Sequence, residues 1–433
     1  MESYSYAELK KDPVIDELPN PFRKADGTNV QTPAEWEEQR IYLKEMLAQY
    51  LYGHMPQQAG CVTGKILSSV PCYGGRALTE ELELTIIRDK EIELPVKIVR
   101  PVAASQVPVV IWNQNDKKET CPLEKELVCN YGYALAVFSR VDLAADSALG
   151  RHGKLAQAYP EADWGVIAMW AWGHSRIADY LLTTDWADGE KLIVTGHSRG
   201  GKAALCAAIY DERFAVCASS GAGCGGTGCF RFMGDRWGEG HGICETAGTI
   251  NDMAGYWWCD RFAGYGARNY TYTGSDFPEK TASELMKNYS YVNAGKLRNE
   301  STLPFDLHFA KSLIAPRCLI TTDGLGDTWS NPYGTQITWR AAQEVFDYLG
   351  AADHNALYFH NGGHKYGRAD WQAVLDFCEY CFGHGREIEE LSMFPKPDHK
   401  LSAMEKMMQA MDWKNERRHY SWRSPQPSEP VME

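Results

Sequence analysis

The spacing of hydrophobic positions changes near residue 100, and this change predicts the main architecture. Residues 61–100 alternate apolar and polar side chains, which is typical of antiparallel strands with one face in a core. Farther along, short runs are almost wholly apolar, and helical patterns lie between several of them. These runs span residues 109–112, 133–138, 191–195, 214–218, 317–322 and 356–359. Such alternation predicts helical crossovers around a buried parallel sheet, and therefore an α/β fold.

The first segment of the chain is predicted to be a helical extension of this domain. Residues 1–60 are mostly polar and contain one amphipathic pattern over residues 33–52. Thr32, Pro33 and Glu35 have the order expected at the start of a helix, since a threonine caps the end and proline is tolerated in the first turn.

The remaining length fits one domain, residues 1–433, with two further additions. Residues 222–305 are rich in glycine, aromatic and polar residues and separate two of the predicted strands. Loops at the carboxyl ends of parallel strands shape ligand sites, so we expect this insertion to wall the active site. Residues 386–433 are predicted to form a loosely packed tail with one helix over residues 403–411.

A Gly-x-Ser-x-Gly motif centred on Ser198 follows a β-branched run and precedes a helix-forming run. In this strand–turn–helix context the motif is the sequence form of a nucleophile elbow, which exposes the serine at the positive end of a helix. We therefore predict Ser198 to be a nucleophile. A near-copy of the motif around Ser175 has Ile177 in place of the second glycine and lies in a helical pattern over residues 164–182. The hydroxyl of Ser175 is expected to bond a backbone carbonyl one turn back.

The charge of the chain argues against two classes of partner. The 433 residues carry a net charge of −13, which disfavours nucleic acid and anionic membrane surfaces as main partners. No uninterrupted apolar run has the length of a membrane span.

Cysteine usage and the first residues bear on the compartment. The N-terminal residues lack the basic and apolar segments of a signal peptide, and the 13 cysteines are mostly scattered. Cys318 falls in an apolar run, where a reduced cysteine acts as a small core residue. Cys378 and Cys381 are interpreted as structural, because no second pair completes a zinc site. These features predict a cytoplasmic protein, with secretion as the alternative if the chain is a trimmed piece.

A serine nucleophile needs a base and an acid, which follow it along the chain in a hydrolase arrangement. His364 lies in a glycine-containing loop after the last predicted strand and is preferred as the base over His360, which is nearer that strand. Asp327 lies deep in the preceding loop and is preferred as the acid over Asp323, a residue that could cap a turn at the strand end. The acid would orient the imidazole and stabilise its protonated form.

The oxyanion hole completes the predicted machinery. Its first donor is expected to be the backbone N–H of Arg199, and its second a group in residues 113–115, which follow a predicted strand.

Several sequence blocks extend this prediction beyond the elbow. They are Asp26-Gly-Thr28, Tyr52-Gly-His-Met-Pro56, Trp170-Ala-Trp-Gly-His-Ser-Arg-Ile-Ala-Asp179, Gly196-His-Ser-Arg-Gly-Gly-Lys202, Ser220-Gly-Ala-Gly223, Leu303-Pro-Phe-Asp306, Ile314-Ala-Pro-Arg317, Asp327-x-Trp329 and Gly362-Gly-His364. With these blocks in order, most of the chain resembles the glucuronoyl esterases of the bacterial type, which cleave esters of 4-O-methyl-glucuronic acid in glucuronoxylan.

The resemblance implies an α/β-hydrolase fold, a three-layer sandwich with a mostly parallel central sheet and helices on both faces. It implies a serine esterase for a small-molecule or oligosaccharide substrate, with no metal and no organic cofactor; the oligomeric state stays open. By resemblance, the Arg199 side chain joins its backbone N–H at the oxyanion. Lys202 and Trp329 are implied to contact sugar hydroxyls or the uronate group.

Two departures from the family pattern keep alternatives open. Fungal members carry a catalytic Glu after the strand that follows the elbow, where Ser219 stands here, which leaves Asp327 as the acid. A sugar-contacting Gln or Glu of the insertion aligns with Thr249 or Gly248. The alternatives are an acetyl-xylan or other carbohydrate esterase on the same triad, and a non-catalytic sugar-binding relative.

Overall fold

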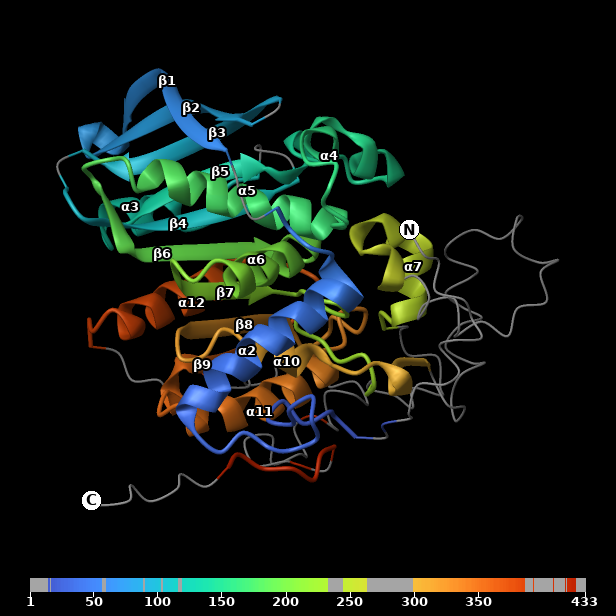
Figure 1. Ribbon diagram of the computed structural model, residues 1–433. Helices are drawn as coiled ribbons and strands as arrows, with labels where there is room; N and C mark the ends of the chain where they lie inside the picture. Colours follow the sequence, from blue (N-terminus) through green and yellow to red (C-terminus); the bar gives the residue numbers. More distant parts are fainter. Residues whose placement is uncertain are drawn as a thin grey trace, which may run out of the picture.

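A mixed sheet runs through the centre of the molecule in the computed structural model (Figure 1). The structure describes residues 15, 17–56, 60–88, 90–102, 104–115, 119–232, 244–262, 299–385, 392, 408, 417 and 419–425. Within these residues the strands are β1 (Cys61–Cys72), β2 (Ala77–Ile87), β3 (Glu91–Pro101), β4 (Val107–Gln114), β5 (Ala134–Ser139), β6 (Ala187–His197), β7 (Phe214–Ser220), β8 (Cys318–Gly324) and β9 (Asn355–His360). Their order is β1-β2-β3-β5-β4-β6-β7-β8-β9. Pairing is antiparallel from β1 through β3 to β5 and parallel from β5 to β9, as the sequence predicts.

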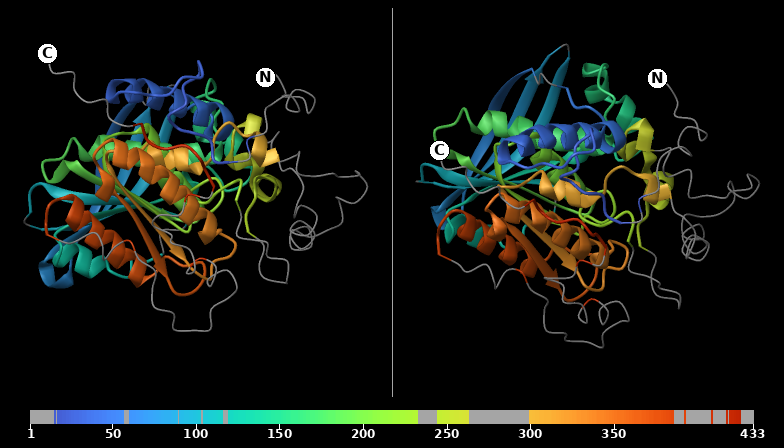
Figure 2. Two further views of the ribbon diagram at one scale, coloured as in Figure 1. Left: turned by 90° about the horizontal axis from the view of Figure 1, so that it is seen from below. Right: turned by 60° about the horizontal axis from the view of Figure 1, so that its bottom comes forward.

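Helices cover both faces of the sheet, because alternate side chains of a buried strand point to opposite faces. The described helices include α2 (Pro33–Leu47), α3 (Glu124–Cys129), α4 (Lys154–Ala158), α5 (Val166–Leu181), α6 (Arg199–Tyr210), α7 (Ala247–Ala254), α10 (Leu307–Ser312), α11 (Pro332–Tyr348) and α12 (Arg368–Cys381). Ile193 of β6 packs into one core with α3 and α12, whereas the next residue, Val194, packs into a second core with α5, α6 and α11. Figure 2 shows α2 in blue and α12 in orange-red on opposite sides of the sheet. The predicted three-layer α/β-hydrolase fold is confirmed.

The predicted N-terminal helix forms nearly as expected. The Thr32 side chain accepts a hydrogen bond of 3.2 Å from the backbone N–H of Glu35, and Pro33 occupies the first turn of α2. A π-helical turn, Ala48–Tyr52, continues the helix. The mostly polar residues 1–60 thus contain one well-capped helix, α2. Its buried Trp36 belongs to the larger core.

Ser175 lies inside α5, as its helical context predicts. Its hydroxyl hydrogen-bonds the carboxylate of Asp211, which helps to hold the pKa of that carboxyl below its usual value despite burial. The expected bond to a backbone carbonyl is therefore wrong, and a buried carboxylate next to the helix explains the difference.

Parts of the predicted extension, insertion and tail lie outside the described residues. These parts are residues 1–14, 233–243, 263–298 and most of 386–433, including the predicted helix over 403–411. The division of the chain into these additions stays a prediction. In the portion of the chain that is described, no helix combines the length and the apolar character needed to cross a membrane.

The prediction that Cys318 is a reduced core cysteine is wrong. Cys318 at the start of β8 forms a disulfide with Cys381 at the end of α12, across a Cα–Cα distance of 6.6 Å. The helix returns over the sheet, so two cysteines 63 residues apart meet.

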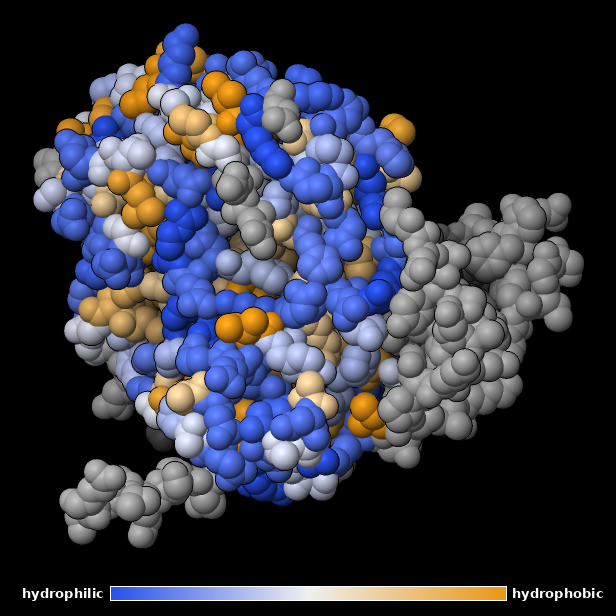
Figure 3. Space-filling view, in the orientation of Figure 1, coloured by the Kyte–Doolittle hydropathy of each residue, from blue (hydrophilic) through white to orange (hydrophobic). Residues whose placement is uncertain are grey.

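The outer edge of the antiparallel region is solvent-exposed. Ile66, Leu67 and Val70 of β1 are 49%, 55% and 57% exposed. Figure 3 shows orange areas among hydrophilic ones at the top of the molecule, where Figure 1 places β1 to β3 in the same orientation. This edge lies at the opposite end of the sheet from β8 and β9.

Candidate active site

The backbone bends sharply between β6 and α6, and Ser198 is the residue at the bend. Its φ of 58° and ψ of −126° lie in a region that non-glycine residues rarely adopt. A Cβ on Gly196 would lie 2.2 Å from the carbonyl oxygen of Gly200, so position 196 admits only glycine without movement. The predicted nucleophile elbow is therefore present, and its strained serine precedes the first turn of a helix.

Asn113 braces this bend from β4. Its amide nitrogen lies 2.9 Å from the carbonyl oxygen of Gly200 and 3.3 Å from that of Thr195. The same nitrogen lies 3.1 Å from Nε2 of His174, whose pKa burial lowers to about 4, so the neutral ring accepts the bond. Residues 113–115 were expected to supply an oxyanion donor, but the Asn113 amide is already committed to the elbow.

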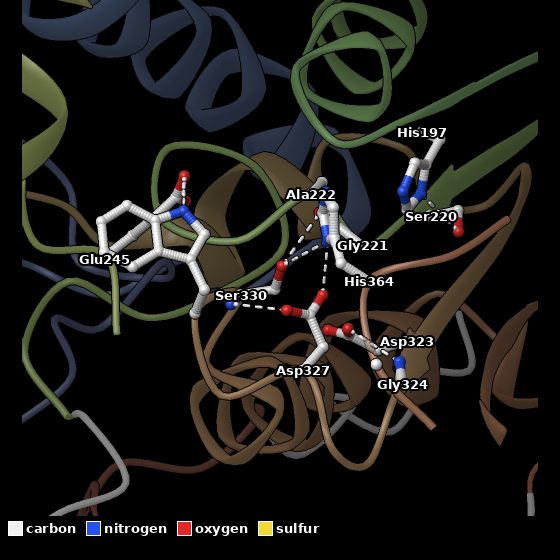
Figure 4. A network of polar contacts seen from close by, with 12 residues as sticks. His197, Ser220, Gly221, Ala222, Glu245, Asp323, Gly324, Asp327, Ser330 and His364 are labelled. Atoms are coloured by element: carbon white, nitrogen blue, oxygen red, sulfur yellow. Dashed lines mark hydrogen bonds and ion pairs between the residues drawn. The ribbon is translucent and has the colours of Figure 1, made fainter. Parts of the chain in front are cut away.

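The loops after β8 and β9 bring Asp327 and His364 together (Figure 4). Asp327 Oδ2 lies 2.6 Å from His364 Nδ1, and Ser330 Oγ lies 3.3 Å from the same nitrogen. The Ser330 hydroxyl donates to the Gly221 carbonyl oxygen at 3.2 Å, so it faces the ring with a lone pair. Both neighbours of Nδ1 are thus acceptors, which places the ring proton on Nδ1 and leaves Nε2 free to act as a base.

The carboxylate of Asp327 stays ionised in this arrangement. Burial favours its neutral form, but the hydrogen bond and charge of His364, together with the bond from the Ser330 backbone N–H, lower the pKa below its usual value. An ionised carboxylate at Nδ1 is what a base needs when it becomes positively charged.

The less favoured candidate acid, Asp323, has other partners. Asp323 lies within β8, where Thr335 Oγ1 and the Gly324 N–H each donate to its carboxylate at 3.0 Å. Burial, and then the charge of Asp327, raise its pKa well above the usual value. In Figure 4 a dashed line joins its carboxylate to Gly324, whereas the line from His364 to a carboxylate runs to Asp327.

The rejected alternative base supports the loop that carries His364. His360 Nδ1 lies 2.8 Å from Asp370 Oδ1, and His360 Nε2 lies 3.2 Å from the Gly363 carbonyl oxygen. Both partners are acceptors, so protonation of both ring nitrogens would satisfy both contacts. Burial opposes this charge, but the hydrogen bond and charge of Asp370 raise the pKa of His360 above its usual value.

The residue before Ser198 packs against His364, which places the predicted nucleophile near the predicted base. The ring centroids of His197 and His364 are 4.4 Å apart, and the Ser198 N–H donates to the Ser220 carbonyl oxygen at 2.8 Å. Burial, and then the charge of His364, lower the pKa of His197 to about 4, so no second positive ring competes there. Among the described contacts, Ser198 Oγ makes no hydrogen bond with His364, so the ring must approach the hydroxyl before a proton moves.

Arg199 leans toward the loop after β5. Its guanidinium forms an ion pair with Asp146 and lies 5.0 Å above the ring of Trp257. Asp146 also accepts from Trp257 Nε1 at 2.9 Å and from the Tyr256 hydroxyl at 3.0 Å. The backbone N–H of Arg199 belongs to the first turn of α6, where N–H groups have no partner within the helix.

Lys202 and Trp329 meet through one carboxylate. Glu245 Oε2 lies 2.8 Å from Lys202 Nζ, and Glu245 Oε1 accepts from Trp329 Nε1 at 3.1 Å. Lys202 Nζ also donates to the Ala222 carbonyl oxygen at 2.6 Å, and its side chain is 2% exposed. We call Lys202, Glu245 and Trp329 the uronate-side cluster, after the uronate contact that the sequence resemblance implies for Lys202 and Trp329.

Metal ligands are not grouped at this site. In the described ranges, no cluster of three or more His, Cys, Asp or Glu side chains has the arrangement needed to hold a metal ion.

A family model described as fungal glucuronyl esterase matches residues 85–272 and 269–350, more than half of the chain. The chain belongs to the glucuronyl esterase family. It is therefore a carboxylic ester hydrolase, and the serine mechanism expected from the elbow is typical of its family.

Relatives extend this family match over most of the chain. The carbohydrate esterase MZ0003, from an unknown prokaryotic organism, is 24% identical over 86% of this chain and 90% of its own length. A 4-O-methyl-glucuronoyl methylesterase from Podospora anserina is 27% identical over 82% of this chain, which spans 64% of that relative.

Solved structures of glucuronoyl esterases share the fold. The enzyme from Caldicellulosiruptor kristjansonii has a TM-score of 0.70 and 27% identity, covering 92% of this chain and 97% of its own. The Sporotrichum thermophile enzyme, solved in complex with methyl 4-O-methyl-beta-D-glucopyranuronate, has a TM-score of 0.64 and 22% identity, covering 87% of this chain and 90% of its own.

Sequence reasoning missed Glu245 in this glucuronyl esterase. It assigned the polar position of the insertion to Thr249 or Gly248, but Thr249 forms a capping box with Thr246 at the start of α7. The useful signal was a carboxylate directly before that helix cap.

The expected loss of a carboxylate after β7 agrees with the structure. Ser219 Oγ donates to the Gly201 carbonyl oxygen at 2.9 Å, so this serine supports the elbow. Residues 221–232 contain no Asp or Glu, and the loop after β8 supplies the carboxylate that meets His364.

Proposed function

We propose that this glucuronyl esterase hydrolyses esters of glucuronic acid through an acyl-enzyme on Ser198, with His364 as base and Asp327 as acid. The observation that carries the assignment is the 2.6 Å contact between His364 and Asp327, with the His364 ring packed against the residue before Ser198. The relatives named above as 4-O-methyl-glucuronoyl methylesterases support the substrate class.

In the proposed first half-reaction, Ser198 Oγ attacks the ester carbonyl carbon as His364 Nε2 takes its proton. The carbonyl electron pair moves onto oxygen, which faces the Arg199 N–H and guanidinium. The tetrahedral intermediate then collapses, the bond to the alcohol oxygen breaks, and His364 returns the proton to that oxygen.

In the second half-reaction, water replaces the alcohol. His364 removes a proton from the water as its oxygen attacks the acyl carbon, and the bond to Ser198 Oγ breaks. The uronic acid leaves, and the proton returns to Ser198. Both halves are balanced by protein groups and water alone.

We assign the sugar ring to the uronate-side cluster. Trp329 is half-buried, so its indole offers a flat surface to a sugar face. Two of the three N–H donors of Lys202 bond to the Ala222 carbonyl oxygen and to Glu245. We therefore assign Lys202 to orient the Glu245 carboxylate toward sugar hydroxyls.

The acetyl-xylan alternative is less favoured by this site. An acetyl group needs neither a cation nor a sugar-sized polar surface on the acyl side. The uronate-side cluster offers such a polar surface through Glu245 and the half-buried Trp329, and an acetyl group would leave it unused.

The test compares purified protein on methyl and benzyl glucuronate and on acetylated xylan, together with fluorophosphonate labelling. We expect turnover of the glucuronate esters and labelling at Ser198. Ser198→Ala should abolish both, with a rate loss on the order of 10⁴ or more. Ser175→Ala, in the near-copy motif, is the matched control and should retain both. Turnover of acetylated xylan alone, or labelling unaffected by Ser198→Ala, would refute the proposal.

A further inference from the structure

A cavity of about 450 Å³ adjoins Ser198, and the uronate-side cluster does not line it. Its walls include Asn113 of β4, Arg140 and Asp146 from the segment after β5, and Arg199. In the sheet, β4 and β5 lie on one side of β6, while β7 and β8, which precede Glu245 and Trp329 of the uronate-side cluster, lie on the other. Ser198 therefore lies between the cavity on the β4 side and the uronate-side cluster on the β7 side.

Arg140 is the unusual group in this cavity. Its residue is 7% exposed, and its guanidinium makes one long hydrogen bond of 3.5 Å, to Asn115 Oδ1, and lies 5.1 Å above the ring of Trp170. Its Nε has no hydrogen-bond partner among the described residues, and no described carboxylate forms an ion pair with it. Burial and the nearby charge of Arg199 lower its pKa to about 10.

Two carboxylates that line the cavity, Asp146 and Glu119, favour the charge of Arg140 electrostatically, but among the described residues neither forms an ion pair with it. Asp146 is already bonded to Arg199, Tyr256 and Trp257. A buried guanidinium without an ion-pair partner is costly, and the cost falls when a ligand supplies an anionic or hydroxyl oxygen.

We propose that this cavity binds the alcohol portion of the ester and selects alcohols whose carboxylate or hydroxyl oxygen reaches Arg140. An ester has two sides, and the uronate-side cluster takes the acyl side in the proposed function, on which this inference rests. The leaving alcohol then lies across Ser198, between Arg140 and the loop after β4. An apolar alcohol would leave the guanidinium desolvated and unpaired.

The test uses two matched substrates, benzyl glucuronate and 4-carboxybenzyl glucuronate, and the ratio of their kcat/KM values. The wild-type ratio is expected to favour the carboxylated alcohol by about tenfold, since a charged hydrogen bond contributes that much. Arg140→Gln should reduce the ratio to about one, and Arg140→Lys should keep part of it. The ratio is independent of the fraction of folded enzyme, so partial misfolding does not imitate the effect.

Two further variants sharpen the result. Glu119→Gln removes an exposed negative charge from the cavity mouth and should raise the ratio, opposite to Arg140→Gln. Arg76→Gln, an exposed residue on the turn before β2, makes the same change in net charge as Arg140→Gln and should leave the ratio unchanged. A wild-type ratio of one or less, or an equal ratio in wild type and Arg140→Gln, overturns this inference. Absence of turnover on methyl glucuronate refutes instead the proposed function.

Discussion

Replacing Asp327 by Asn tests the acid–base pair, because it removes the charge and keeps the shape of the side chain. Asp327 Oδ2 is 2.6 Å from His364 Nδ1, and its side chain is 4% exposed. When His364 takes the proton of Ser198, the carboxylate faces a new positive charge. At about 4 Å between charge centres and an effective dielectric constant of about 20, their attraction is about 4 kcal/mol. Its loss slows acylation by roughly 10³-fold.

The amide adds a second effect of the same sign. An Asn at position 327 can direct its N–H₂ toward Nδ1 of His364, which favours the tautomer with the proton on Nε2. That tautomer cannot accept the Ser198 proton, and a similar exchange in a serine protease lowers kcat by about 10⁴-fold. We therefore expect kcat/KM to fall by roughly 10³- to 10⁴-fold.

Asp323→Asn is the matched control, since it makes the same atom change four residues away. The pKa of Asp323 is raised well above its usual value, so its protonated form resembles the amide. One oxygen remains to accept from Thr335, and kcat/KM should stay within about tenfold of wild type.

The assay is initial-rate hydrolysis of benzyl glucuronate at neutral pH, with fluorophosphonate titration to count active sites. Thermal unfolding of each variant excludes misfolding as the cause. If Asp323→Asn lost 10³-fold while Asp327→Asn kept more than a tenth of the wild-type rate, the acid would be misassigned.

Three other outcomes follow from the site. Glu245→Gln leaves Lys202 buried without a negative partner and should lower the free energy of unfolding by about 3 kcal/mol in denaturant titrations. The double variant with Lys202→Met should recover much of the lost free energy, because it removes the buried charge. Gly196→Ala places a methyl group against backbone and should cost more than about 3 kcal/mol, while Gly153→Ala, whose added Cβ meets nothing nearer than 3.6 Å, should cost less than about 1 kcal/mol by the same assay. Because the folded pKa of His360 is raised, its stabilisation is complete below its unfolded pKa of about 6.5 and disappears as pH rises through the folded value. His360→Gln should therefore destabilise the protein more at pH 5 than at pH 9, and an equal loss at both values would refute the charged state.

Local patterns predicted the sheet and the elbow because their causes are local. The apolar run before Ser198 predicts a buried strand, and the two glycines around it predict a turn that larger residues cannot make. The observed strand β6 and helix α6 flank that turn. Where a contact depended on a distant residue, the same reasoning failed. The bond from Ser175 to Asp211 and the disulfide of Cys318 each join residues far apart in the chain. The spacing of nearby residues therefore predicts neither contact.

Glu245 illustrates the same limit in the site. Its partners, Lys202 and Trp329, lie 43 and 84 residues away, in α6 and in the loop after β8. The carboxylate is needed because a buried ammonium requires compensation, and that requirement becomes visible only once Lys202 is known to be 2% exposed. The sequence alone does not distinguish a buried Lys202 from a solvated lysine on the surface of a helix.

The choice between Asp327 and Asp323 depends on how two loops are joined. The backbone N–H groups of Leu325 and Gly326 donate to the carbonyl oxygens of His360 and Gly362 at 3.0 and 2.8 Å, which joins the acid loop to the base loop directly after their strands. Asp323 precedes this junction and is held by the sheet, so its side chain follows the strand toward α11. Asp327 follows the junction, where the chain has turned back toward His364. Position in the loop therefore predicted the carboxylate that contacts His364, because a backbone junction between neighbouring parallel strands determines which side chain reaches the ring.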